Sequence, residues 1–119
     1  EEWLISAKDK LSMAEDDEGV ANVCCALAVH AIIRANDALT LKFLQVKATR
    51  HDDAPMLFSK ILHQNKIGSE NARFIRLLQK AMMDKSGADY GKKSFDFDEA
   101  KNYVSDAEEF VSIVKGISR

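Results

Sequence analysis

The sequence predicts an all-α protein, an antiparallel bundle of about five helices. Proline occurs once and glycine five times among 119 residues, so little interrupts helices. Strand signals, such as alternating β-branched runs and Asn-Gly turns, are nearly absent. Apolar residues recur at spacings of three and four through most of the chain. We therefore expect a single domain over residues 1–119 with a four-helix, up-and-down core.

Two helices are expected in the first part of the chain. The first covers about 2–15, where Leu4, Ala7, Leu11 and Ala14 share one face. The second covers about 18–45 and is apolar around most of its circumference. A helix of that kind is packed from several sides, so the second helix is predicted to be the central one.

Two further helices are expected after a polar loop at 46–53. Asp52 or Asp53 caps the third helix, which has Pro55 in its first turn and ends near 65–70. Gly68 is a predicted turn residue. Ser69 is the predicted cap of the fourth helix, which ends near 85–87.

A glycine-containing loop is expected at 86–100, followed by the last helix. Asp96 is its predicted N-cap, with Glu99 completing a capping box and Phe95 packing on Ala100. The apolar stripe that continues to Val114 is the cleanest amphipathic pattern in the chain.

Charge and composition narrow the classes of protein. The net charge of -2 gives no long-range attraction for nucleic acid or an anionic membrane, although a local basic patch remains compatible with it. No uninterrupted apolar run approaches the roughly 20 residues that span a bilayer. The chain opens with acidic Glu1 and Glu2, so no signal peptide is expected. We expect a cytoplasmic protein that does not enter membranes.

The two cysteines, Cys24 and Cys25, are adjacent. Neighbours on a helix point about 100° apart, so a disulfide between them would be strained. We expect two buried, reduced thiols. No second Cys or His pair has zinc spacing, and we expect neither a metal nor a cofactor.

A polar stripe interrupts the apolar second helix. His30, Arg34 and Asp37 lie within about 60° of one another at 100° per residue. In one interpretation Arg34 and Asp37 form an ion pair at the edge of the core, with His30 hydrogen-bonded nearby. In the other, the three line a groove that binds a phosphate, a nucleotide or RNA, with Arg34 as the anion contact.

A second polar cluster follows at 47–53, with Lys47, Arg50, His51 and the two aspartates. If this loop folds back over the end of the central helix, His51 comes near Asp37. The alternative is a solvated loop that ends in a helix cap. The tentative ligand-binding residues are therefore His30, Arg34, Asp37 and His51.

Three segments carry a family resemblance: WLISAKDKLSMAEDDEGVANVCCALAVHAIIRANDALT, TRHDDAPMLFSKIL and AKNYVSDAEEFVSIV. Their order resembles the HEPN family, helical domains named for nucleotide binding in higher eukaryotes and prokaryotes. The resemblance covers nearly the whole chain and is that of a divergent prokaryotic member. It implies a helical bundle, commonly a homodimer, with a groove near the long helices.

The resemblance also implies two kinds of activity. Many members are metal-independent RNases that use an arginine, a polar residue after it and a histidine four to six residues beyond the arginine. Others pair with a minimal nucleotidyltransferase as a toxin–antitoxin system. Here Ala35 follows Arg34, the next histidine after Arg34 is His51, and His51 follows Arg50 directly. The RNase motif is therefore missing.

Two functional hypotheses follow. The first is a non-catalytic, self-associating helical module that binds a nucleotide, RNA or a protein partner. The second is a divergent RNase, or a toxin-type protein paired with a nucleotidyltransferase. A site that gathers His30, Arg34, Asp37 and His51 around an open groove would favour the second.

Overall fold

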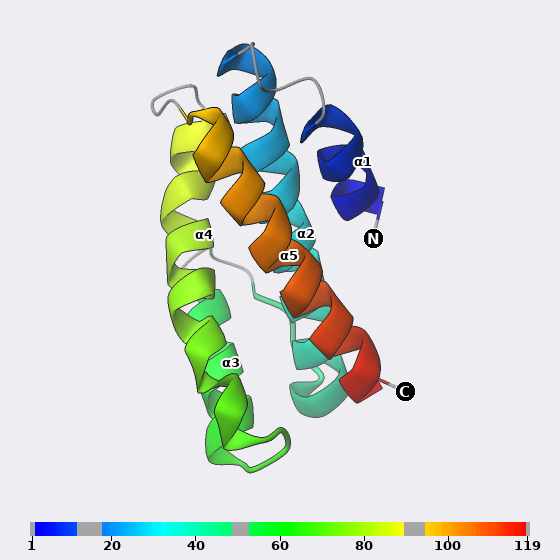
Figure 1. Ribbon diagram of the computed structural model, residues 1–119. Coiled ribbons are helices and arrows are strands. Elements are labelled where there is room, and N and C mark those ends of the chain that lie inside the picture. Colours follow the sequence, from blue (N-terminus) through cyan, green and yellow to red (C-terminus); the bar gives the residue numbers. More distant parts are fainter. Residues whose placement is uncertain (1, 12–17, 49–52, 90–94, 119) are drawn as a thin grey trace.

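The computed structural model is an all-α bundle in which the second helix is central, so the predicted fold class is confirmed (Figure 1). It describes residues 2–11, 18–48, 53–89 and 95–118. In these ranges the helices are α1 (Glu2–Leu11), α2 (Glu18–Leu44), α3 (Asp53–His63), the 3₁₀ helix η1 (Ser69–Arg73), α4 (Phe74–Asp89) and α5 (Phe97–Ser118).

The long helices alternate in direction along the chain (Figure 1). The ring of Trp3 stacks on His30, and the Cys24 thiol donates a hydrogen bond to the carbonyl of Ala7, so α1 runs antiparallel to α2. The amide of Phe95, just before α5, donates to the Asn22 side chain near the start of α2. Helix α5 therefore runs in the same direction as α2.

Helix α4 returns antiparallel to α5. Arg73 pairs with Glu109 at one end of α4, and the Tyr103 hydroxyl donates to the Asp84 carboxylate at the other. Helices α1, α3, α4 and α5 all pack against α2. Helices α4 and α5, however, scarcely approach each other at the level of the backbone, so the space between them is spanned by side chains.

The core combines many small buried residues on α2, together with Ile32 and Leu39, with buried aromatic rings from the surrounding helices. Buried alanines and cysteines on α2 let the neighbouring helices approach closely. Phe110 of α5 lies between two other rings, with centroids 6.0 Å from Phe58 and 5.0 Å from Phe74. These contacts tie α3, α4 and α5 to one core.

The end of α2 and the start of α3 agree with the sequence-based prediction, whereas α3 ends at His63, before the predicted 65–70. Helix α2 ends at Leu44, where Gln45 turns the chain with a left-handed φ of 58°. Helix α3 begins at Asp53 and has Pro55 in its first turn. The predicted end of the first helix falls partly in residues 12–17, outside the described residues.

The predicted role of Ser69 is wrong. The cap position is Gly68, which supplies no side-chain hydrogen bond, and Ser69 is the first residue of η1. Asn71 stabilises this 3₁₀ turn instead, because both its backbone amide and its side-chain amide donate to the Gly68 carbonyl. The following α-helix consequently starts only at Phe74.

The capping box of the last helix is confirmed. The Glu99 amide donates to the Asp96 carboxylate at 2.8 Å, and the Asp96 amide donates to the Glu99 carboxylate at 3.3 Å. Phe95 and Ala100 are both fully buried, as a hydrophobic staple requires. The loop before it is shorter than predicted, since α4 continues to Asp89.

Both cysteines are free and buried, as predicted. The sequence-based expectation about membranes rests on the absence of a long uninterrupted apolar run. A helix that includes some polar residues can also be long and apolar enough to span a bilayer. Residues Gly19–Leu44 form a helix long and apolar enough to cross a membrane by length and composition. The core helix of a globular bundle meets the same criteria, and here α2 is packed by four other helices.

Candidate functional site

His30, the first residue of the predicted polar stripe, faces α1. Its ring stacks on Trp3 with centroids 4.8 Å apart and an angle of 29° between the planes. The imidazole is half-buried by this contact. Helix α1 therefore covers His30, and the imidazole is not openly exposed to a ligand.

Asp37, the last residue of the stripe, is buried, with 7% of its surface exposed. Burial raises the pKa of its carboxyl, and the charges of Lys47 and then Arg34 lower it. Among the described residues, no ion pair joins Asp37 to Arg34 directly. The internal Arg34–Asp37 pair that the sequence left open is not formed.

Two more polar residues on α2 are buried beside Asp37. The Asn36 side-chain amide donates to the carbonyl of Ala54 at 3.3 Å, which holds α2 to the start of α3. The Thr40 hydroxyl donates to the carbonyl of Asp37 at 3.2 Å. These side chains serve the packing of the helices.

The second predicted cluster is only partly described. Lys47 is exposed, and its charge is the strongest attraction on Asp37, so the chain after α2 does fold back toward this carboxylate. Asp53 is the first residue of α3. Arg50, His51 and Asp52 lie outside the described residues.

Arg34, the middle residue of the stripe, is exposed and lines a groove between α2 and α5, here called the Arg34 groove. The groove has a volume of about 300 Å³, and its lining residues are Ala31, Arg34, Ala35, Ala38, Val111, Val114 and Lys115. Two cations therefore border an otherwise aliphatic surface. None of these lining residues carries a carboxylate.

The groove adjoins α1 on the surface that α2 and α5 form. Helix α1 lies against α2 and α5 (Figure 1). Near the N-terminus of α1, Trp3 stacks on His30. The groove begins at the next residue of α2, Ala31. Within the described residues, the groove therefore lies beside the Trp3–His30 contact and follows α2 from Ala31 to Ala38.

Sequence reasoning identified Arg34 but missed Lys115. The apolar stripe of the last helix predicts its buried face, and Lys115 follows directly after Val114 at the edge of that stripe. The sequence shows Lys115 as a cation beside the apolar stripe. Only the parallel packing of α5 on α2 places Lys115 and Arg34 on the same groove.

The chemistry of the groove is that of an anion site with apolar walls. A guanidinium presents several donors in a plane that matches phosphate and carboxylate oxygens, and an ammonium adds a second positive charge. Among the described residues, no group of three or more His, Cys, Asp or Glu side chains could hold a metal ion.

Comparisons with protein-family models, with curated proteins and with solved structures find no significant match to this chain.

Proposed function

We propose that the protein is a non-catalytic helical module that binds a phosphate-bearing ligand, a nucleotide or RNA, in the Arg34 groove. The observation that carries the proposal is the exposed Arg34 on an aliphatic groove that Lys115 also lines and that has no carboxylate in its lining. The resemblance to HEPN domains supports the same ligand class. The homodimer and the nucleotidyltransferase partner remain predictions of that resemblance.

The charges around Arg34 favour an anionic ligand. Asp37 is buried, and although the Arg34 charge lowers the pKa of its carboxyl, no direct ion pair joins the two side chains. The phosphate of a ligand would meet Arg34 and Lys115 without opposition from a lining carboxylate. The methyl groups of Ala35 and Val114 would contact a base or sugar ring.

The lining residues favour binding over cleavage. Cleavage of RNA requires a group within hydrogen-bond reach that takes the proton of the 2′-hydroxyl. The groove offers guanidinium, ammonium and aliphatic groups, and His30 is stacked under Trp3. We therefore place the divergent RNase second.

The test is a thermal-shift screen of the full chain with nucleotides and short RNA oligomers. The variants are Arg34→Ala, Arg34→Lys and, as a control, Lys101→Ala, which removes an exposed cation outside the groove. A ligand at 100 times its Kd adds about 2.7 kcal/mol to the free energy of unfolding. We expect that gain in the wild type and the control, a smaller gain in Arg34→Lys, and none in Arg34→Ala.

Three other results would count against the proposal. If no nucleotide or RNA stabilises the wild type, the protein does not have this ligand class. A shift that survives Arg34→Ala would place the site elsewhere. Loss of intact RNA over time, abolished by His51→Ala, would favour the RNase over the binding module.

A further inference from the structure

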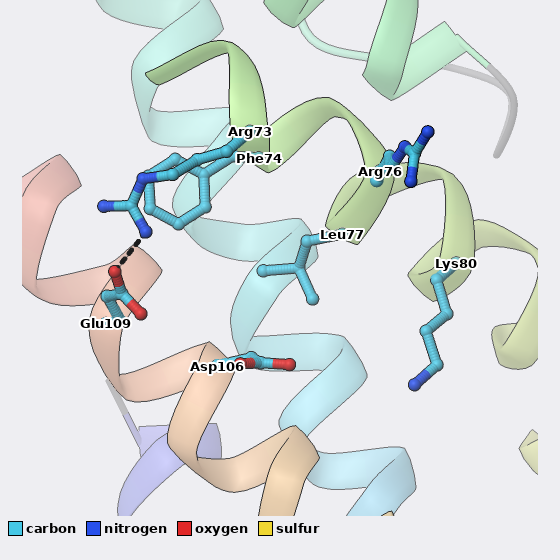
Figure 2. A pocket seen from close by; sticks show the side chains of 7 residues that line it. All are labelled: Arg73, Phe74, Arg76, Leu77, Lys80, Asp106 and Glu109. Carbon is cyan, nitrogen blue, oxygen red and sulfur yellow. Dashed lines mark hydrogen bonds and ion pairs between the residues drawn. The ribbon is translucent and has the colours of Figure 1, made fainter. Parts of the chain in front are cut away.

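A second cavity lies between α4 and α5 (Figure 2). This α4–α5 cleft has a volume of about 300 Å³ and forms where the two helices pack on α2 without close backbone contact to each other. Its α5 residues, Asp106 and Glu109, lie about 120° or more around the helix from Val111 and Lys115 at about 100° per residue. The cleft and the Arg34 groove are therefore separate surfaces.

The two walls of the cleft carry opposite charges. Arg73 of η1 and Arg76 and Lys80 of α4 form one wall, at spacings of three and four that place them along one side of the helix. Asp106 and Glu109 of α5 form the other. Leu77 points into the space between the helices (Figure 2).

Part of this charge is satisfied within the protein. Arg73 forms an ion pair with Glu109 and lies over the Phe74 ring, with the guanidinium carbon 4.3 Å from the centroid. The Lys80 ammonium lies 4.4 Å from the centroid of the Tyr103 ring. Figure 2 shows Arg76 and Lys80 on the other side of Leu77 from the Arg73–Glu109 pair.

Arg76 and Asp106 are the remaining charged groups of the cleft. Among the described residues, neither forms an ion pair or a side-chain hydrogen bond. Burial and the Glu109 charge raise the pKa of the Asp106 carboxyl, and Lys80 lowers it. Asp106 is exposed at the mouth of the cleft, so a hydroxyl donor of a ligand can replace water on this carboxylate.

These charges select the chemistry of a ligand. A bare phosphate is attracted by Arg76 and Lys80 but repelled by Asp106. A cationic ligand is attracted by Asp106 but repelled by Arg76 and Lys80. A ligand that carries a phosphate and neutral hydroxyl donors satisfies both walls, because a carboxylate accepts hydrogen bonds from hydroxyl groups.

We propose that the α4–α5 cleft binds a sugar phosphate, with the phosphate on Arg76 and Lys80 and a sugar hydroxyl donating to Asp106. Leu77 contacts the apolar face of the sugar ring. The site does not depend on the Arg34 groove, since the two share no residue.

The experiment follows backbone amide signals of α4 and α5 by NMR while ribose 5-phosphate, inorganic phosphate or ribose is added to the full chain. We expect ribose 5-phosphate to bind about tenfold more tightly than phosphate, the effect of one hydrogen bond to a charged group. Ribose alone should bind more weakly than either. Arg76→Ala should weaken both phosphate-bearing ligands by about tenfold or more.

The variant Asp106→Ala separates the hydroxyl contact from phosphate binding. It should abolish the preference for ribose 5-phosphate and tighten the binding of inorganic phosphate, since a repelling charge is removed. Arg34→Ala is the matched control and should leave all these affinities unchanged, whatever becomes of nucleotide binding in the Arg34 groove.

Each contrary outcome overturns the proposal. Ribose 5-phosphate that perturbs no signal of the cleft, or that binds no more tightly than phosphate, removes the sugar phosphate as ligand. Tighter binding of phosphoethanolamine than of ribose 5-phosphate would assign an ammonium, and not a hydroxyl, to Asp106. Loss of binding in Arg34→Ala would assign the effect to the other groove.

Discussion

The polar residues of α2 show how far a single residue can be predicted from sequence. The helical period correctly places His30, Arg34 and Asp37 along one side of the helix. It does not say what covers each of them. Trp3, which lies far away in the sequence, stacks on His30, and Lys47 provides the main attraction on Asp37. Arg34 is the exposed residue of the three and lines the groove between α2 and α5.

Asp37 gives the first prediction at this scale. Its pKa is raised from 3.8, so the stability it contributes is present below that value and is lost as the pH rises through the folded-state pKa. We expect Asp37→Asn to increase the free energy of unfolding at pH 7 by on the order of 1 kcal/mol relative to wild type. The gain should shrink as the pH falls toward 3.8, the unperturbed value. Urea unfolding at both pH values measures it, and a pH-independent difference would contradict it.

Cys25 gives the second prediction. Burial first, and then the charges of Cys24, Glu99 and Asp84, raise the pKa of its thiol from 9.0 to about 12. The unfolded chain therefore loses this proton above pH 9 while the folded chain keeps it, and stability falls as the pH rises through that window.

We expect the Cys25 thiol to contribute a slope of about -1.4 kcal/mol per pH unit to the free energy of unfolding. Urea unfolding from pH 8 upward, compared between wild type and Cys25→Ala, measures it. The variant should show a shallower slope, though not a flat one, because burial also raises the pKa of Cys24 and of Tyr103. Parallel slopes in the two proteins would show that the thiol titrates normally in the folded chain.

At the scale of elements, the sequence predicts helices well and some of their ends. The box of Asp96 and Glu99 is a local pattern whose partners are three residues apart, so it forms as predicted. Ser69 offers the same kind of side chain but no cap. There Asn71 and the Gly68 carbonyl form a 3₁₀ turn first, and the α-helix begins later. Competing local hydrogen bonds of this kind are not visible in apolar periodicity.

These two helix starts form a matched pair for mutation. Asp96→Ala removes a cap hydrogen bond from the exposed start of α5 and should lower the free energy of unfolding by about 1 kcal/mol. Ser69→Ala should change it by less than about 0.5 kcal/mol, because Ser69 supplies no cap. Urea denaturation of both variants provides the comparison. Equal losses would contradict the difference between the two helix starts.

At the scale of the whole molecule, both candidate sites arise from the way helices of unequal length surround α2. The composition and periodicity of α2 predict its central place. They do not predict that Trp3 of α1 packs on His30, or that α4 and α5 stay apart at the backbone. Arg34 could therefore be proposed from sequence, whereas Lys115, Arg76 and Asp106 acquire their roles only from the packing.

Phe110 tests whether this packing is cooperative. Its ring joins α5 to Phe58 of α3 and Phe74 of α4, and it is 1% exposed. Phe110→Ala should lower the free energy of unfolding by about 3–5 kcal/mol, from lost burial and a residual cavity. Met83→Ala, at a side chain that is 78% exposed, is the control and should change it by less than about 0.5 kcal/mol.

The single tryptophan reports on the opposite part of the molecule, since Trp3 lies on α1. If α1 and the other helices form one cooperative core around α2, Trp3 fluorescence and far-UV circular dichroism must give coincident unfolding transitions. Both should move by the same amount in Phe110→Ala. A Trp3 transition that keeps its wild-type midpoint while the dichroism shifts would show that α1 detaches independently. The Arg34 groove, which lies next to the Trp3–His30 contact, would then have a boundary that opens without global unfolding.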